Sequence, residues 1–274
     1  MKIKAGMRIG ISSCLIGESV RYDGGHKRIR TIIDTLAPVA ELLPTCPEVE
    51  LGMGIPRPPL ILVEGMPGEL RMVTASGEGQ DYTERMADLA AEVRTDRLAG
   101  ISGCIFKARS PSCGVGDVPV FNPRGDIVRT NSFGLFSGII QRMMPNLPVA
   151  DENSLAMAAD IRQFVERAFV FRAWIDNAIE TDEQLNQFHR QVREHAAVRS
   201  ASLAEELDQI AACVPDEGLT ACFERYFALL MSGLKTPPIH AGRANSLHAK
   251  IERTCAAVRG AGLRGDDMQD CSLR

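Results

Sequence analysis

The chain has 274 residues, of which 45% are hydrophobic, and a formal net charge of -4 at pH 7. That length allows one large or two ordinary domains, and the acidic balance excludes a generic nucleic-acid binder, which usually carries a basic surface. No stretch approaches about 18 uninterrupted apolar residues, and the N-terminal apolar run is short and broken by charge. We therefore expect a cytoplasmic protein without a signal peptide or a membrane span.

The first half of the chain alternates short apolar segments with amphipathic ones. The expected strands, in chain order, are Met7–Ser13, Val39–Thr45, Leu60–Val63, Ala99–Phe106 and Leu147–Ala150. The expected helices are Ile29–Leu36, Asp81–Arg97 and Leu135–Met144. This alternation predicts an α/β fold with a doubly wound, mostly parallel sheet and helices on both faces, in three αβα layers.

The pattern changes after about residue 155, where no segment has the character of a strand. Four segments have helical periodicity: Ala156–Ile179, Glu183–His195, Leu203–Cys213 and Leu219–Leu234. The sequence therefore predicts two domains, an α/β domain over residues 1–155 and an all-helical domain over residues 156–274.

Three of the eight cysteines follow predicted strands. Cys14 ends the first strand, Cys46 ends the second, and Cys113 lies in the loop after Ala99–Phe106. Ligands of open α/β sheets bind outside the carboxyl ends of the strands, so we expect these three thiols to converge on one rim. Cys104 lies inside its strand and is expected to pack in the core.

Converging thiols in a reducing compartment indicate a soft metal or an iron–sulfur cluster. Three ligands leave one position open, which is typical of a catalytic centre. An oxyanion-binding Cys-x5-Arg loop is an alternative, but Arg21 lies one residue too far from Cys14. A structural zinc site with His26 as fourth ligand is another, although the chain has no Cys-x2-Cys pair.

Two neighbours of the cysteines could take part in chemistry. Glu48, two residues after Cys46, is a candidate general acid or base, or else an ordinary loop glutamate. Ser110, three residues before Cys113, could orient a water or a substrate carbonyl, or only initiate a Ser-Pro turn.

The candidate substrate-binding residues come from the loops after Cys14 and Cys46. Asp23 either caps a turn or accepts a hydrogen bond from a base N–H. The cationic candidates for binding a phosphate are Arg21, Lys27 and Arg57, and Ser13 beside Cys14 completes the set.

The segments SSCLIGESVRYDGGHK, CPEVELGMGIPRPP and SPSCG resemble, in order and spacing, the thiouracil desulfidase (TudS-like) family. The resemblance covers roughly residues 8 to 150. It implies a [4Fe-4S] cluster held by Cys14, Cys46 and Cys113, with Glu48 and Ser110 as the catalytic pair. It also implies hydrolytic, non-redox removal of sulfur from thiolated uracil, in which water supplies oxygen and hydrosulfide leaves.

Two segments of the second half, LNQFHRQ (Leu185–Gln191) and HAGRANSLH (His240–His248), resemble weakened versions of segments in the helical YbgA-like family. We expect this domain to be degenerate or truncated. Phe188 is expected to pack in its core, and His189 and His248 to be hydrogen-bonded helix residues rather than ligands.

Together these features predict a desulfidase that acts on a small thiolated uracil, with no nucleic-acid or membrane partner. The basic residues near Cys14 lead us to expect that a thiouridine monophosphate is a better substrate than the free base. Two alternatives stay open. One is an iron–sulfur or zinc sensor whose helical domain contacts a partner, and the other is a desulfidase acting on thionucleosides in RNA.

Overall fold

The computed structural model describes residues 6–66, 69–75, 79–95, 98, 100–212 and 219–238. Its strands are β1 (Met7–Ser12), β2 (Ala40–Thr45), β3 (Leu60–Glu64), β4 (Leu70–Thr74), β5 (Gly103–Phe106), β6 (Val118–Phe121), β7 (Ile127–Ser132) and β8 (Val149–Asp151). The helices of the same half are α1 (Ser13–Ile16), α2 (Arg30–Leu36), α3 (Pro47–Glu50), α4 (Thr83–Thr95) and α5 (Leu135–Met143).

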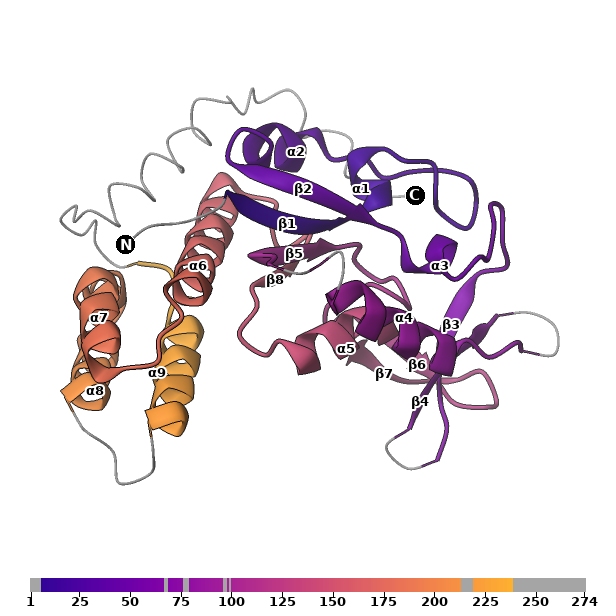
Figure 1. Ribbon diagram of the computed structural model, residues 1–274. Helices are drawn as coiled ribbons and strands as arrows, with labels where there is room; N and C mark the ends of the chain where they lie inside the picture. Colours follow the sequence, from indigo (N-terminus) through magenta and orange to yellow (C-terminus); the bar gives the residue numbers. More distant parts are fainter. Residues whose placement is uncertain are drawn as a thin grey trace.

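Sheet A contains four parallel strands in the order β2-β1-β5-β8. Its central strands are almost wholly buried, as expected for a parallel sheet covered on both faces. Figure 1 shows helices on both sides of this sheet. The predicted fold class, a mostly parallel sheet in αβα layers, is confirmed.

Sheet B was not predicted. Its order is β4-β3-β6-β7, with β3 parallel to β6 and the outer strands β4 and β7 paired as antiparallel hairpins. No strand is expected from the sequence between Phe106 and Leu135, but the structure has β6 and β7 there. The error has a physical reason: β7 is almost entirely exposed and shows no apolar alternation, while β6 has only four residues.

The second half of the chain is helical in its described part. It forms α6 (Ala158–Asn177), α7 (Asp182–Ala197), α8 (Ala201–Ala212) and α9 (Leu219–Gly233). Aromatic side chains fill the space between them, with Trp174 stacked on Phe227 at a centroid distance of 4.5 Å. The predicted all-helical character of this half is confirmed, whereas Cys213 and the segment His240–His248 lie outside the described residues.

Helix α6 joins the helical half to sheet A. A Cβ built on Gly103 in β5 would lie 2.9 Å from the Phe164 ring, so the helix and the strand pack closely. Arg172 donates to the carbonyl oxygen of Gly100 at 2.7 Å, just before the same strand. A single hydrophobic cluster accordingly runs from β1 to α9. The division into domains at residue 155 stays a prediction.

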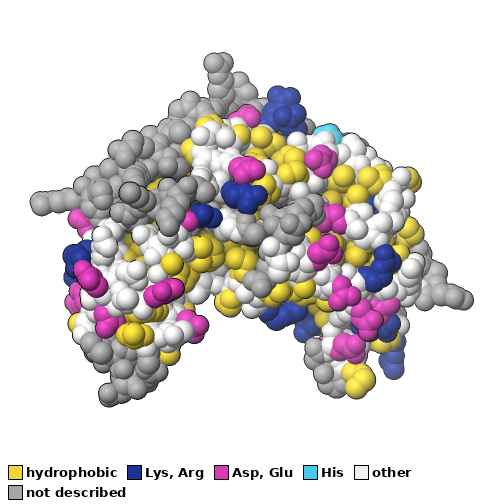
Figure 2. Space-filling model, viewed as in Figure 1, with side chains coloured by type: hydrophobic (Ala, Val, Ile, Leu, Met, Phe, Trp, Pro, Cys, Tyr) yellow, Lys and Arg dark blue, Asp and Glu magenta, His cyan; other side chains and the backbone are white. Residues whose placement is uncertain are grey.

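None of the helices in the described part of the chain is long and apolar enough to cross a membrane. On the face drawn in Figure 2, lysine and arginine side chains are scattered among acidic ones rather than gathered in one area.

Candidate functional site

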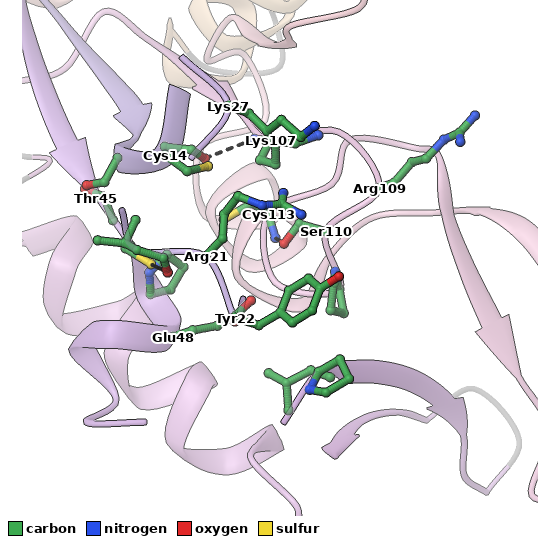
Figure 3. Close-up of a pocket in the computed structure, with 18 of the residues that line it drawn as sticks. Cys14, Arg21, Tyr22, Lys27, Thr45, Glu48, Lys107, Arg109, Ser110 and Cys113 are labelled. Carbon is green, nitrogen blue, oxygen red and sulfur yellow. Dashed lines mark hydrogen bonds between the residues drawn. The ribbon is translucent and has the colours of Figure 1, made fainter. Parts of the chain in front are cut away.

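A cavity of about 470 Å³ opens at the carboxyl ends of the strands of sheet A. The segments that follow β1, β2 and β5 all contribute to its walls, and each brings one of the predicted cysteines: Cys14, Cys46 and Cys113. The expected convergence of the three thiols is therefore what the structure shows. Figure 3 shows two of them, Cys14 and Cys113, among the side chains that line the cavity. Whether they bind a metal stays a prediction.

Cys14 is the second residue of α1, a single turn that follows β1 directly. Gly17 ends this turn in the left-handed region, with a φ of 106°, where glycine is favoured. The chain then loops out and returns, and the backbone N–H of Lys27 donates to the Cys14 carbonyl oxygen at 2.9 Å. The basic loop is thus held against the segment that carries the first thiol.

Cys46 is the residue before α3, and Pro47 fits the first helical position, where its missing N–H removes no helical hydrogen bond. The backbone N–H of Cys46 donates to the Glu50 carboxylate at 3.1 Å. Its sulfur lies 3.8 Å from the carbonyl oxygen of Val20, in the loop after Cys14. The second thiol therefore contacts the loop of the first.

The loop that carries Cys113 is fixed by two sets of hydrogen bonds. The Ser110 hydroxyl oxygen accepts from the backbone N–H groups of Ser112 at 3.3 Å and Cys113 at 3.1 Å. From the other side, the first N–H groups of α5 donate to the carbonyl oxygens of Pro111 and Ser112. Gly134 lies so close that a Cβ there would be 2.5 Å from the backbone of Ser112. The loop is consequently rigid.

The three thiols share one electrostatic environment. Burial, together with the neighbouring Cys46, raises the pKa of Cys14 to about 11. Burial also raises the pKa of Cys46. For Cys113, burial and then the neighbouring Cys46 and Glu48 hold the pKa well above its usual range. Three thiolates crowded in this way repel one another, and a bound cation would offset that electrostatic repulsion.

Cys104 is a different case. It lies inside β5, away from the cavity, and burial raises its pKa to about 12. The interpretation of Cys104 as a core residue is confirmed.

Glu48 lies on the cavity wall with both carboxylate oxygens engaged. Arg57 donates from Nε to Oε2 at 2.7 Å, and the Ser112 hydroxyl donates to Oε1 at 2.7 Å. Sequence analysis missed the contribution of Ser112, which is fully buried behind the cavity. The carboxylate thereby links the loop of Cys46 to the loop of Cys113.

Arg57 was proposed from the sequence as a phosphate ligand, but the structure shows a different set of contacts. Its side chain is 3% exposed and donates to Glu48 and to the carbonyl oxygens of Gly54 and Val20. Arg57 also lines the cavity, and three of its five N–H groups donate within the protein, so its role as a phosphate ligand stays a prediction.

The remaining cations around the cavity differ in how far they are neutralised. Lys107, which the sequence analysis did not select, forms an ion pair with Glu152 just after β8. Arg21 lies 3.5 Å from Asp23. Within the described part of the chain, no carboxylate pairs with Lys27, while Arg109 extends away from the other labelled side chains in Figure 3.

The last two sequence candidates fall on either side of the cavity boundary. Ser13 lines the cavity beside Cys14. Asp23 lies outside the lining, and its carboxylate accepts from the Gly25 N–H at 3.0 Å. This is the turn-capping arrangement that the sequence left open as one of two possibilities. The hydrogen bond from Gly25 and the charge of Arg21 lower the pKa of Asp23.

Residues 9–152 match the model of the 2-thiouracil desulfurase family. The chain belongs to this family. Among solved structures, the [4Fe-4S]-dependent thiouracil desulfidase TudS is similar, with 32% sequence identity and a TM-score of 0.44 over 55% of this chain and 93% of that chain. No match was found among curated proteins. Every cavity residue discussed above lies within this matched range.

Among the residues that the structure describes, no three His, Cys, Asp or Glu side chains are grouped closely enough to hold one metal ion. A cubane cluster is larger than a single ion, so its ligands surround a volume instead of meeting at a point. The three cysteines line one cavity of about 470 Å³.

Proposed function

We propose that the protein removes sulfur from thiolated uracil by hydrolysis without net redox chemistry, using a [4Fe-4S] cluster held by Cys14, Cys46 and Cys113. The observation that supports this most is that three thiols from three strand ends line one cavity together with a carboxylate. Family membership makes thiouracil the expected substrate class.

The donor set fits an iron–sulfur cluster with one open iron. Thiolates are the protein ligands of such clusters, and three of them leave one iron without a protein ligand. When bound, the cluster would supply an iron with a high affinity for the substrate sulfur. His26, the fourth ligand required by the zinc alternative, is not among the residues that line the cavity.

Glu48 is the candidate general base and acid. The overall reaction replaces the C=S sulfur with the oxygen of water and releases hydrosulfide and a proton, so no electrons are gained or lost. Glu48 would accept a proton from the attacking water and then return it, a role that typically contributes about 10²–10⁴-fold. The Ser110 hydroxyl still has its proton to donate, because its oxygen acts only as acceptor in the two hydrogen bonds of the loop.

A thiouridine monophosphate is the proposed preferred form of the substrate. No carboxylate among the residues that the structure describes pairs with Lys27, and Arg21 lines the same cavity and is only partly neutralised by Asp23. Charge-assisted hydrogen bonds of this kind are stronger than neutral ones. Ser13, also on the wall, is a candidate donor or acceptor for the base.

The test is anaerobic purification or reconstitution, followed by iron and sulfide analysis and a turnover assay with thiouracil, its monophosphate and intact thiolated tRNA. Sulfide release from the small substrates supports the proposal. Cluster binding without turnover favours the sensor, and turnover of tRNA alone favours the RNA desulfidase. A cytoplasmic location and the role of the YbgA-like helical half stay predictions that this assay does not address.

A further inference from the structure

Arg57 connects all three cysteine loops through Glu48. Its Nη2 donates to the Val20 carbonyl oxygen at 2.8 Å, in the loop after Cys14, and its Nε donates to Glu48 at 2.7 Å. The same carboxylate receives the Ser112 hydroxyl at 2.7 Å, next to Cys113. A third donation from Arg57, to Gly54 at 3.1 Å, fixes the arginine within its own loop.

This arrangement determines the direction of the Glu48 carboxylate. Each carboxylate oxygen holds one donor from a buried side chain, Arg57 at Oε2 and Ser112 at Oε1. Each oxygen keeps a further lone pair, which can accept from a water or a substrate in the cavity. The guanidinium of Arg57 is planar and rigid, so it fixes the directions of its N–H donors. A lysine ammonium has freely rotating donors and cannot do this.

We propose that Arg57 and Ser112 are positioning residues that orient Glu48 for proton transfer, and that Arg57 does not bind substrate. The inference rests on the proposed function, in which Glu48 transfers the proton. Positioning matters because a displacement of about 1 Å at a reacting group can cost about 10²-fold in rate.

The experiment compares Arg57→Lys, Arg57→Met and Ser112→Ala with the unmodified, cluster-loaded protein. Each is assayed for kcat and KM with thiouracil and with the monophosphate, and for bound iron. We expect Arg57→Lys to lower kcat by about 10²-fold on both substrates, with KM and iron content unchanged. Arg57→Met should lose at least as much, and Ser112→Ala less, because one of the two donors remains.

Two comparisons separate positioning from a general loss of structure. Arg71→Lys is the matched control, because Arg71 pairs with Asp81 on the surface away from the cavity, and it should leave activity unchanged. In a Glu48→Ala background, Arg57→Lys should cause little further loss, since residues that act through one another are not additive.

Crystal structures of metal-free wild type and Arg57→Lys give a readout that does not depend on turnover. We expect the Glu48 carboxylate to have rotated or moved in the variant. An unmoved carboxylate with unchanged kcat overturns the proposal, and so does a raised KM confined to the monophosphate, which would show that Arg57 binds the anion. If the wild type has no desulfidase activity, the proposed function fails, and the crystal structures alone decide whether Arg57 positions Glu48.

Discussion

The cavity and the helical half use similar polar residues in opposite ways. In the helical half, several polar side chains pair with one another: His189 contacts Tyr226 and Asp208, and Glu166 pairs with His195 and Arg199. At the cavity, three thiols face the same space without any covalent bond between them, and Lys27 has no carboxylate partner among the described residues. A satisfied network indicates packing, whereas a concentrated set of unpaired groups in a cavity indicates a ligand.

The protonation of the helical network agrees with a structural role. Burial lowers the pKa of His189, so its ring is neutral at pH 7. Nε2 then donates to the Asp208 carboxylate at 2.9 Å, and Nδ1 accepts from the Tyr226 hydroxyl at 2.9 Å. The prediction that His189 is a hydrogen-bonded helix residue is confirmed, as is the burial of Phe188.

The largest expected effect is loss of the cluster. Replacing Cys14, Cys46 or Cys113 with alanine should remove bound iron and abolish turnover, because two thiolates cannot hold a cubane in place. Iron analysis and the visible absorbance of anaerobically prepared protein measure this. Cys104→Ala is the control from the same domain and should keep both iron and activity. Full iron retention in Cys14→Ala would contradict the ligand assignment.

Glu48→Ala should give the next largest effect and separate chemistry from cluster binding. We expect bound iron at the wild-type level, since Glu48 is not a ligand, and a fall in kcat of about 10²–10⁴-fold. The measurement is steady-state turnover at matched iron content. A fall smaller than tenfold would show that Glu48 is not the principal acid or base.

Lys27→Ala and Arg21→Ala should have a smaller effect, confined to substrates that carry a phosphate. Each lost charge-assisted hydrogen bond is expected to lower kcat/KM for the monophosphate about ten- to a hundredfold, corresponding to about 1.5–3 kcal/mol. The change should appear in KM, because a remote phosphate binds equally in ground and transition states. Arg124→Ala, an exposed arginine on the β6–β7 turn, is the charge-matched control. Equal kcat/KM for base and monophosphate in the wild type would remove the basis for this role.

The sequence predicted the convergence of the cysteines because it depends on a general rule: the carboxyl ends of neighbouring parallel strands meet at one edge. It could not predict the network around Glu48, because the fold brings Arg57 and Ser112 to this carboxylate, and Ser112 lies 64 positions from Glu48 in the sequence. For the same reason it could not show that Arg57 pairs with Glu48, and it missed Lys107, although Lys107 follows the buried strand β5 directly. The sequence indicates residue types and their positions at the strand ends, but it does not indicate which side chains form hydrogen bonds or ion pairs with one another.

The smallest expected effect on activity comes from the helical half. Tyr226 is fully buried, and Tyr226→Phe removes the hydroxyl that donates to His189 Nδ1. Leaving that buried acceptor unsatisfied should lower the free energy of unfolding by about 1–3 kcal/mol, measured by chemical denaturation. Tyr82→Phe is a comparison variant, because the Tyr82 hydroxyl donates to the exposed Gln80, where water can replace it, so its cost should be smaller. At a temperature where both variants are folded, kcat and KM should equal those of the wild type. A selective loss of turnover in Tyr226→Phe, with stability unchanged, would mean that this network serves the reaction and that the contrast between the two regions is wrong.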